Sequence, residues 1–171
     1  MPDTLLTDVA ETKLTVAAGS ASEVAITHIA LGDGNGATYA PAHAQTALIR
    51  ERARVPVETR HFAGDRTWRV KAEFPPTTVA FAVREMGFFD ADGDLIAVWA
   101  GVDVDPRQTG VVTYLVEHVL DFSRVDDGLI IVDAPDDDLF DLAVITGIGF
   151  ANLQTEQLRQ ADRIRAEHGE Y

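Results

Sequence analysis

Apolar and polar residues alternate with a period of two through most of the middle of the chain. The clearest run covers residues 111–122, VVTYLVEHVLDF, in which the even positions are apolar except for His118. The odd positions include Thr113, Glu117 and Asp121. This pattern predicts a strand with one face toward a core and the other toward water or a partner.

Shorter runs predict further strands, mostly joined as hairpins. They cover residues 24–31, residues 56–62 and 67–74 around AGDR, residues 79–90 and 94–104 around DADGD, and residues 128–132. Residues 46–55, TALIRERARV, favour a short helix or a turn instead. The strands of the middle region are expected to be antiparallel.

Helical spacing is confined to the two ends of the chain. Residues 4–17 predict a helix that stops before Gly19. Helices at the ends and antiparallel strands between them predict an α+β fold. It consists of a mainly antiparallel β domain at 1–134 with an N-terminal helix, and a C-terminal helical tail at 135–171 that serves as an oligomerisation or joining segment.

The C-terminal segment opens with acidic residues and closes with basic ones, which suits a helix dipole. Spacings of four and three form a weak heptad seam, whose apolar members are Phe140, Val144, Ala151, Leu158 and Ala161. Gly147 and Gly149 weaken the helix. Three arrangements stay open: a helix packed on its own domain, two helices broken at the glycines, and a self-associating coiled coil.

Charge narrows the classes of partner. With 14 basic and 28 acidic residues the net charge is −14, so a phosphate backbone is repelled and nucleic acid is not expected as a partner. Residues 50–71 are rich in arginine and residues 133–141 in aspartate. The simpler interpretation is two solvated faces, and the sharper one is that the two segments meet between copies or with partners.

Other features of composition exclude a few classes of site. The chain has no cysteine, so disulfides and thiolate metal sites are ruled out. No apolar run approaches the roughly 20 residues of a membrane-spanning helix, so membrane insertion is not expected. The N-terminal MPDTLLTDVAET lacks the basic and apolar regions of a secretory signal.

The stretch DADGD, residues 90–94, places three aspartates at the first, third and fifth positions of an EF-hand loop. The match fails afterwards, because the glycine comes at the fourth position and the twelfth residue is Gly101. Aspartate and glycine between two alternating runs are typical of a hairpin turn, and so is GDGNG at 32–36. No metal site and no cofactor are predicted.

No residue is nominated as catalytic. The five histidines are scattered without a metal-binding pair, and His118 on its apolar face is expected to be a core histidine. A glycosidase-type carboxylate pair stays open, because separation in space defines it. Trp68, Trp99 and Tyr114 on strand faces leave a carbohydrate-binding module open as well, since aromatic platforms stack on sugars.

Three stretches, taken together, resemble the N-terminal domain of phage tail-collar fibre proteins. They are ITHIALGDGNG at 26–36, QTALIRERARV at 45–55 and VAFAVREMGFFDADGDLIAV at 79–98. The residues that carry the resemblance are Gly32, Asp33, Gly34, Arg84, Glu85, Gly87, Phe88, Phe89, Asp90, Asp92 and Gly93.

The resemblance implies a structural role in a virion tail and no catalysis. It implies a homo-oligomer, with a trimer favoured, and contact with baseplate or other tail proteins. It also implies synthesis in the cytoplasm of a bacterial host. Fibre proteins of this kind usually continue into a long shaft, so a short adaptor or a fibre remnant is expected, from a phage, a prophage or a phage-derived particle.

Arg84 and Glu85 are neighbours in a predicted strand and therefore point to opposite faces. If one of them points inward it needs a partner, and a structural ion pair is the simplest expectation. The alternative is that both are ordinary surface residues.

Overall fold

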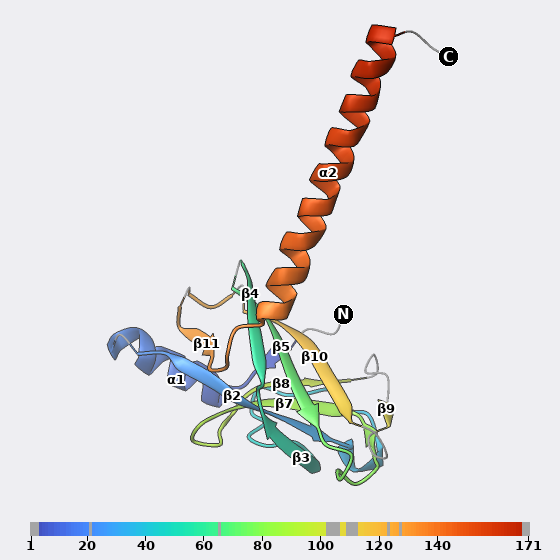
Figure 1. Cartoon of the computed structure of the whole chain (residues 1–171). Coiled ribbons are helices and arrows are strands. Elements are labelled where there is room, and N and C mark those ends of the chain that lie inside the picture. Colours follow the sequence, from blue (N-terminus) through green and yellow to red (C-terminus); the bar gives the residue numbers. More distant parts are fainter. Residues whose placement is uncertain are drawn as a thin grey trace. The chain divides into compact units, whose positions relative to one another are not determined.

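The computed structural model describes residues 4–20, 22–64, 66–101, 107–108, 113–122, 124–126 and 128–168. Within these ranges, the side chains of residues 107–108, 138–145, 148, 164 and 166–168 are not described. The chain forms two compact units, Met1–Asp136 and Asp137–Tyr171. The first unit is mostly β with one helix near its start, and the second is a helix (Figure 1).

The larger sheet of the first unit has six strands built around β2. In spatial order they are β1 (Leu5–Leu6), β8 (Leu95–Ala100), β7 (Glu85–Asp90), β2 (Val24–Gly32) and β11 (Ile130–Val132), and β3 (Glu51–Pro56) also pairs with β2. All pairs are antiparallel except β11 with β2, which is parallel. The expectation that the strands are antiparallel is therefore wrong for residues 130–132.

The second sheet has three antiparallel strands in the order β10 (Tyr114–Asp121), β5 (Thr67–Phe74) and β4 (Thr59–Gly64). In Figure 1 these strands run side by side, and β7 and β8 lie behind them. A small third sheet pairs β6 (Ala82–Val83) with β9 (Arg107–Gln108). The hairpin predicted around AGDR is confirmed as the β4–β5 pair.

One hydrophobic core joins the two larger sheets and the N-terminal helix. Phe88 and Ile96 enter it from the first sheet, and Val70 and Leu120 from the second. Helix α1 (Asp8–Ser20) contributes its buried face, which consists of Ala10, Leu14 and Ala17. A smaller cluster contains Leu48, Phe89 and Leu95. The inward and outward alternation predicted for residues 111–122 is confirmed over β10, and residues 111–112 lie outside the described residues.

Helix α1 starts later than predicted, at Asp8, and ends at Ser20. Leu5 and Leu6 are taken by β1, which pairs with β8. The Thr7 hydroxyl then accepts a hydrogen bond from the Ala10 N–H at 3.1 Å and so caps the first turn. Pairing with a distant strand thus overrides helical propensity over the first residues.

The helix or turn expected at residues 46–55 is wrong, because residues from Glu51 onward form β3 against β2. The run at 79–90 is also divided into β6 and β7 at Arg84, whose N–H bonds the Gly32 carbonyl at 2.9 Å. The run at 94–104 forms β8 only to Ala100, and residues 102–104 lie outside the described residues.

His118 is a core histidine, as expected. Its Nε2 lies 3.0 Å from the Thr4 hydroxyl, and its ring packs between Phe88 and Trp99 at centroid distances of 5.2 and 5.1 Å. Burial lowers the pKa of His118 to about 4 from its usual value of 6.5. Burial therefore keeps the ring neutral in the folded protein.

We expect acid to destabilise the protein through His118. Between pH 6.5 and 4 the unfolded chain binds a proton at this ring and the folded chain does not, so stability falls as pH falls through this window. Because the side chain keeps some exposure, the loss is about 1–3 kcal/mol. Urea unfolding of wild type and His118→Gln from pH 7 to 4 measures it. Parallel pH profiles of the two proteins would contradict this assignment.

The second unit contains α2 (Asp138–His168), a continuous helix of 31 residues. The alternative of two helices broken at Gly147 and Gly149 is therefore wrong. Of the predicted seam, the side chains of Ala151, Leu158 and Ala161 are exposed, while those of Phe140 and Val144 lie outside the described side chains. Phe150 and Leu153 are also exposed, at 64% and 62%.

Among the described residues, no helix has the length and apolar character needed to cross a membrane.

Candidate functional site

The residues that carry the family resemblance converge on one buried carboxylate, Glu85 at the start of β7. Its side chain is fully buried. Oε1 accepts hydrogen bonds from the N–H groups of Gly34 at 3.1 Å and Arg50 at 2.9 Å. Oε2 accepts from the Ile49 N–H at 2.8 Å and from the Tyr39 hydroxyl at 2.7 Å. Four donors thus offset the cost of burying the charge.

The ion pair expected at this position is therefore wrong for Glu85. Among the described residues its carboxylate pairs with no lysine or arginine side chain, and three of its four partners are backbone N–H groups. Arg84 is half-buried and makes no ion pair with any other residue that the structure describes. Backbone donors satisfy the carboxylate because the connection between β2 and β3, residues 33–50, closes over it.

Gly32 is required here by space. A Cβ at this position would lie 2.3 Å from the Glu85 Oε1 and 2.7 Å from the Arg50 carbonyl oxygen. Gly34 is required for a different reason, since its φ of +55° lies in the left-handed region. The turn predicted at GDGNG is confirmed, and it forms a short 3₁₀ segment at Gly34–Gly36.

Asp33 fixes the same loop from its other side. Its carboxylate accepts two hydrogen bonds from the Arg50 guanidinium, at 2.6 Å from Nε and 2.5 Å from Nη2. It also accepts the Asn35 N–H at 3.1 Å. The hydrogen bonds from Arg50 lower the pKa of Asp33 and outweigh the opposing effect of burial. Asp33 is thus held as a carboxylate in a forked pair.

Tyr39 links the hub to the loop that follows. Its hydroxyl donates to Glu85 and accepts from the Gln45 Nε2 at 2.9 Å, and Gln45 also donates to the Ala47 carbonyl at 2.8 Å. Burial raises the pKa of Tyr39, as does the nearby Glu85 carboxylate. We call this set the Glu85 hub, which consists of Gly32, Asp33, Gly34, Tyr39, Gln45, Ile49, Arg50 and Glu85.

The sequence alone did not single out Tyr39 and Gln45. They lie in an irregular segment whose hydrogen bonds reach across the fold, so no local period marks them. Arg50 was noted only as one member of a basic cluster. The signal that could have found them is the buried Glu85 itself, because a buried carboxylate must find donors.

Asp90, Asp92 and Gly93 form the turn between β7 and β8, which confirms the interpretation of DADGD as a hairpin turn. Asp90 Oδ1 accepts the N–H groups of Asp92 at 3.1 Å and Asp94 at 2.9 Å. Gly93 has a φ of +87°, which a side chain would disfavour. The side chain of the first aspartate thus organises the turn by accepting N–H groups of the residues that follow it.

The three turn carboxylates gather within 4.8 Å of one another, close enough to hold a cation. The ammonium of Lys13 from α1 lies among them. Its Nζ pairs with Asp90 and lies 3.0 Å from Asp92 Oδ2 and 2.7 Å from Asp94 Oδ2. Burial works to lower the pKa of Lys13, but hydrogen bonds to the three carboxylates raise it. The protein's own cation thus offsets part of the negative charge of the turn.

Gly87, Phe88 and Phe89 carry the resemblance as packing residues. A Cβ at Gly87 would lie 2.7 Å from the Phe89 ring and 3.0 Å from the side chains of Leu48 and Leu95. Phe88 and Phe89 are almost completely buried. These three positions therefore hold β7 against both hydrophobic clusters.

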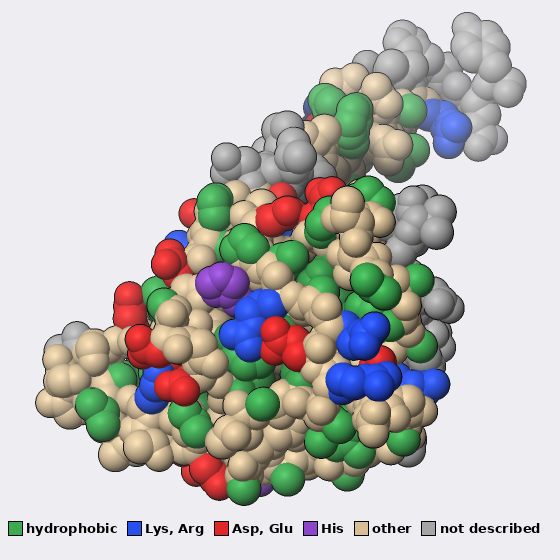
Figure 2. All heavy atoms as spheres, turned by 90° about the horizontal axis from the view of Figure 1, so that it is seen from below, with side chains coloured by type: hydrophobic (Ala, Val, Ile, Leu, Met, Phe, Trp, Pro, Cys, Tyr) green, Lys and Arg blue, Asp and Glu red, His purple; other side chains and the backbone are tan. Residues whose placement is uncertain are grey.

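The basic residues at 50–71 pair largely within the chain. Arg50 and Arg52 face Asp33, and Arg54 binds Glu51. Arg60 binds Asp136 at 3.1 Å and so joins the basic and acidic segments inside one protein. On the face in Figure 2, lysine and arginine side chains lie with aspartate and glutamate beside them. Neither two separate faces nor contacts between copies are needed to explain this charge pattern.

The geometry favours a scaffold over a reactive centre. The Glu85 carboxylate is closed off from solvent with all its donors in place, and the turn carboxylates are paired with Lys13. Trp99 and Tyr114 pack against the core. The model of one protein family, the phage tail-collar fibre protein N-terminal domain, matches residues 1–109.

The chain belongs to the phage tail-collar fibre family. The match covers the Glu85 hub, the acidic turn and both core phenylalanines, so the positions that carry the resemblance all lie inside it. Neither curated proteins nor solved structures gave a match to this tail-collar fibre protein. Membership makes it a structural protein of phage tails.

Proposed function

We propose that this tail-collar fibre protein attaches fibre material to the baseplate of a tailed phage, a prophage or a phage-derived particle. The observation that carries the proposal is the family match over residues 1–109, which covers most of the first unit. In this proposal the chain is made in the bacterial host cytoplasm, is incorporated into the virion tail and catalyses no reaction.

The construction of the Glu85 hub supports an attachment role. Hydrogen bonds from residues 34, 39, 49 and 50 tie the long connection between β2 and β3 to β7. Such cross-linking gives a rigid surface, which lowers the entropy cost of docking on a large assembly. The same closure leaves the buried carboxylate without access for a substrate.

Helix α2 supports assembly with further copies of the chain, and we propose a trimer. An isolated helix gains most of its stability from packing an apolar face. Every described side chain of α2 is exposed, including Phe150, Leu153 and Leu158. Leu158 lies in the predicted seam and Phe150 lies directly beside it, so this exposed face of α2 can pack against other helices.

Light scattering on the full chain and on a chain that ends at Asp136 tests the trimer. We expect three times the mass of one chain for the first protein and a monomer for the second, because the truncation removes the apolar helix. Leu158→Glu in the predicted seam should act like the truncation, while Gln160→Glu, which adds the same charge on the other side of the helix, serves as the control. A full chain that stays monomeric at high concentration would refute assembly through α2.

Deletion of the gene in the phage or strain that encodes it tests attachment. Tail particles from the deletion mutant should lack fibres in electron micrographs, and the full chain supplied from a plasmid should restore them. Particles that keep their fibres without this chain would contradict the proposal. Within the part of the chain that the structure describes, no observation favours a carboxylate-pair hydrolase.

A further inference from the structure

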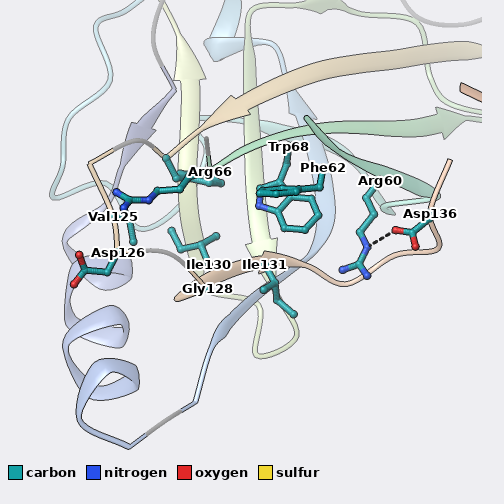
Figure 3. A pocket seen from close by; sticks show the side chains of 11 residues that line it. Arg60, Phe62, Arg66, Trp68, Val125, Asp126, Gly128, Ile130, Ile131 and Asp136 are labelled. Carbon is teal, nitrogen blue, oxygen red and sulfur yellow. Dashed lines mark hydrogen bonds and ion pairs between the residues drawn. The ribbon is translucent and has the colours of Figure 1, made fainter. Parts of the chain in front are cut away.

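A cleft of about 280 Å³ lies in the first unit, between the β4–β5 hairpin and β11 (Figure 3). Its aromatic wall consists of Phe62 and Trp68, whose ring centroids are 4.8 Å apart at an angle of 52°. Ile130 and Ile131 lie opposite this wall. Phe62 is 50% exposed, so its ring is accessible at the cleft.

Charged groups of both signs lie at the two ends of the cleft. At one end the Arg60 Nε binds the Asp136 carboxylate at 3.1 Å, and its guanidinium lies 5.4 Å from the centre of the Trp68 ring. At the other end lie Arg66 and Asp126 (Figure 3). Each end therefore offers hydrogen-bond donors from a guanidinium and acceptors from a carboxylate.

Arg66 occupies its place at the cost of backbone strain. Its φ of +62° is left-handed, a conformation that costs a non-glycine residue about 1–2 kcal/mol. The Phe122 N–H bonds its carbonyl at 3.1 Å and holds the turn in place. Strain of this kind tends to occur where a side chain is positioned for a task.

We propose that this cleft binds a neutral saccharide, with one sugar ring stacked on Phe62 and Trp68. The charges at each end are balanced, so the cleft gives an ionic ligand no net attraction, and the net charge of −14 repels anions. An apolar side chain would remove water from the charged groups without replacing its hydrogen bonds. Hydroxyl groups both donate and accept, so a sugar satisfies carboxylates and guanidiniums together.

The size of the cleft agrees with this ligand class. Its volume lies near the lower end of the roughly 300–1,000 Å³ that is typical of small-molecule sites. The two tilted rings present an apolar surface that suits the C–H face of a sugar ring. The cleft residues all belong to the first unit, and the inference does not depend on the attachment role.

Titration of the full chain with neutral sugars, followed by NMR of the two tryptophan indole N–H groups, tests the proposal. The probes are glucose, galactose, mannose and N-acetylglucosamine, followed by neutral oligosaccharides built from the best of them. The Trp68 signal should shift with a Kd of about 1–10 mM for a single ring, while the Trp99 signal stays in place. Glucuronate, the acidic counterpart, should bind at least tenfold more weakly.

Phe62→Ala should weaken binding by about tenfold or more, because it removes half of the stacking surface. Leu115→Ala is the matched control, since Leu115 is 61% exposed on β10 of the same sheet and lies outside the cleft. The absence of any Trp68 shift in the folded protein, or binding that Phe62→Ala leaves unchanged, would overturn the proposal. A Trp68 shift with N-acetyl-leucine amide and with no sugar would overturn it too, and would assign the cleft to an apolar side chain of a partner.

Discussion

Glu85→Ala is expected to remove a large part of the stability of the first unit. The substitution leaves three N–H groups and the Tyr39 hydroxyl without the acceptor that they share. Each unsatisfied buried donor costs about 1–3 kcal/mol. Since Ile49 and Arg50 are partly exposed, water can reach some of these groups, and we expect a total loss of about 3–5 kcal/mol. That is a large part of the roughly 5–15 kcal/mol typical of a folded domain.

Two milder variants separate the hydrogen bonds from the space that Glu85 fills. Glu85→Gln keeps the shape but turns an NH₂ group toward donors, so its loss should lie between those of Glu85→Ala and Tyr39→Phe. Tyr39→Phe removes a single hydrogen bond and should cost about 1 kcal/mol. Urea unfolding followed by circular dichroism measures all three. Equal stability of Glu85→Ala and wild type would refute the structural role of the hub.

Gly32→Ala is expected to destabilise the protein by about 3 kcal/mol or more, through overpacking. The added methyl group would lie 2.7 Å from the Arg50 carbonyl oxygen, which belongs to the backbone and cannot move aside by rotating a side chain. It would also push on the Glu85 carboxylate and so break the hub. Thermal unfolding should show a clear fall in Tm.

Gly19→Ala is the matched control for this substitution. Gly19 lies in α1, and a Cβ there would meet no atom within 4 Å. Because alanine favours the helix more than glycine does, Gly19→Ala should leave stability unchanged or raise it by up to about 1 kcal/mol. If the two alanine variants had the same Tm, close packing would not be the reason why position 32 requires glycine.

Alternation of apolar residues predicted the parts of the fold that depend on local pattern. β10, the β4–β5 hairpin and the DADGD turn follow from a period of two interrupted by glycine and aspartate. β3 could not be predicted in this way, because three consecutive charged residues at 50–52 interrupt the alternation and its strand structure comes from pairing with β2. The parallel pairing of β11 likewise depends on a crossover between distant segments.

The hub could be anticipated only in part. The adjacency of Arg84 and Glu85 indicated that one of them points inward, and Glu85 does. Its partners could not be named, because backbone N–H groups from loops carry no mark in the sequence. Lys13 was equally hidden, since its contact with the turn at Asp90 joins segments 77 residues apart.

Gold labelling of α2 in intact tail particles tests the central claim most directly. A tag after Tyr171 of the chain, bound by gold and seen by electron microscopy, should lie at the junction of baseplate and fibre. It should be missing from particles of the deletion mutant. Gold at the distal tips of the fibres, or no gold on particles while the tagged chain stays free in the lysate, would contradict an attachment role.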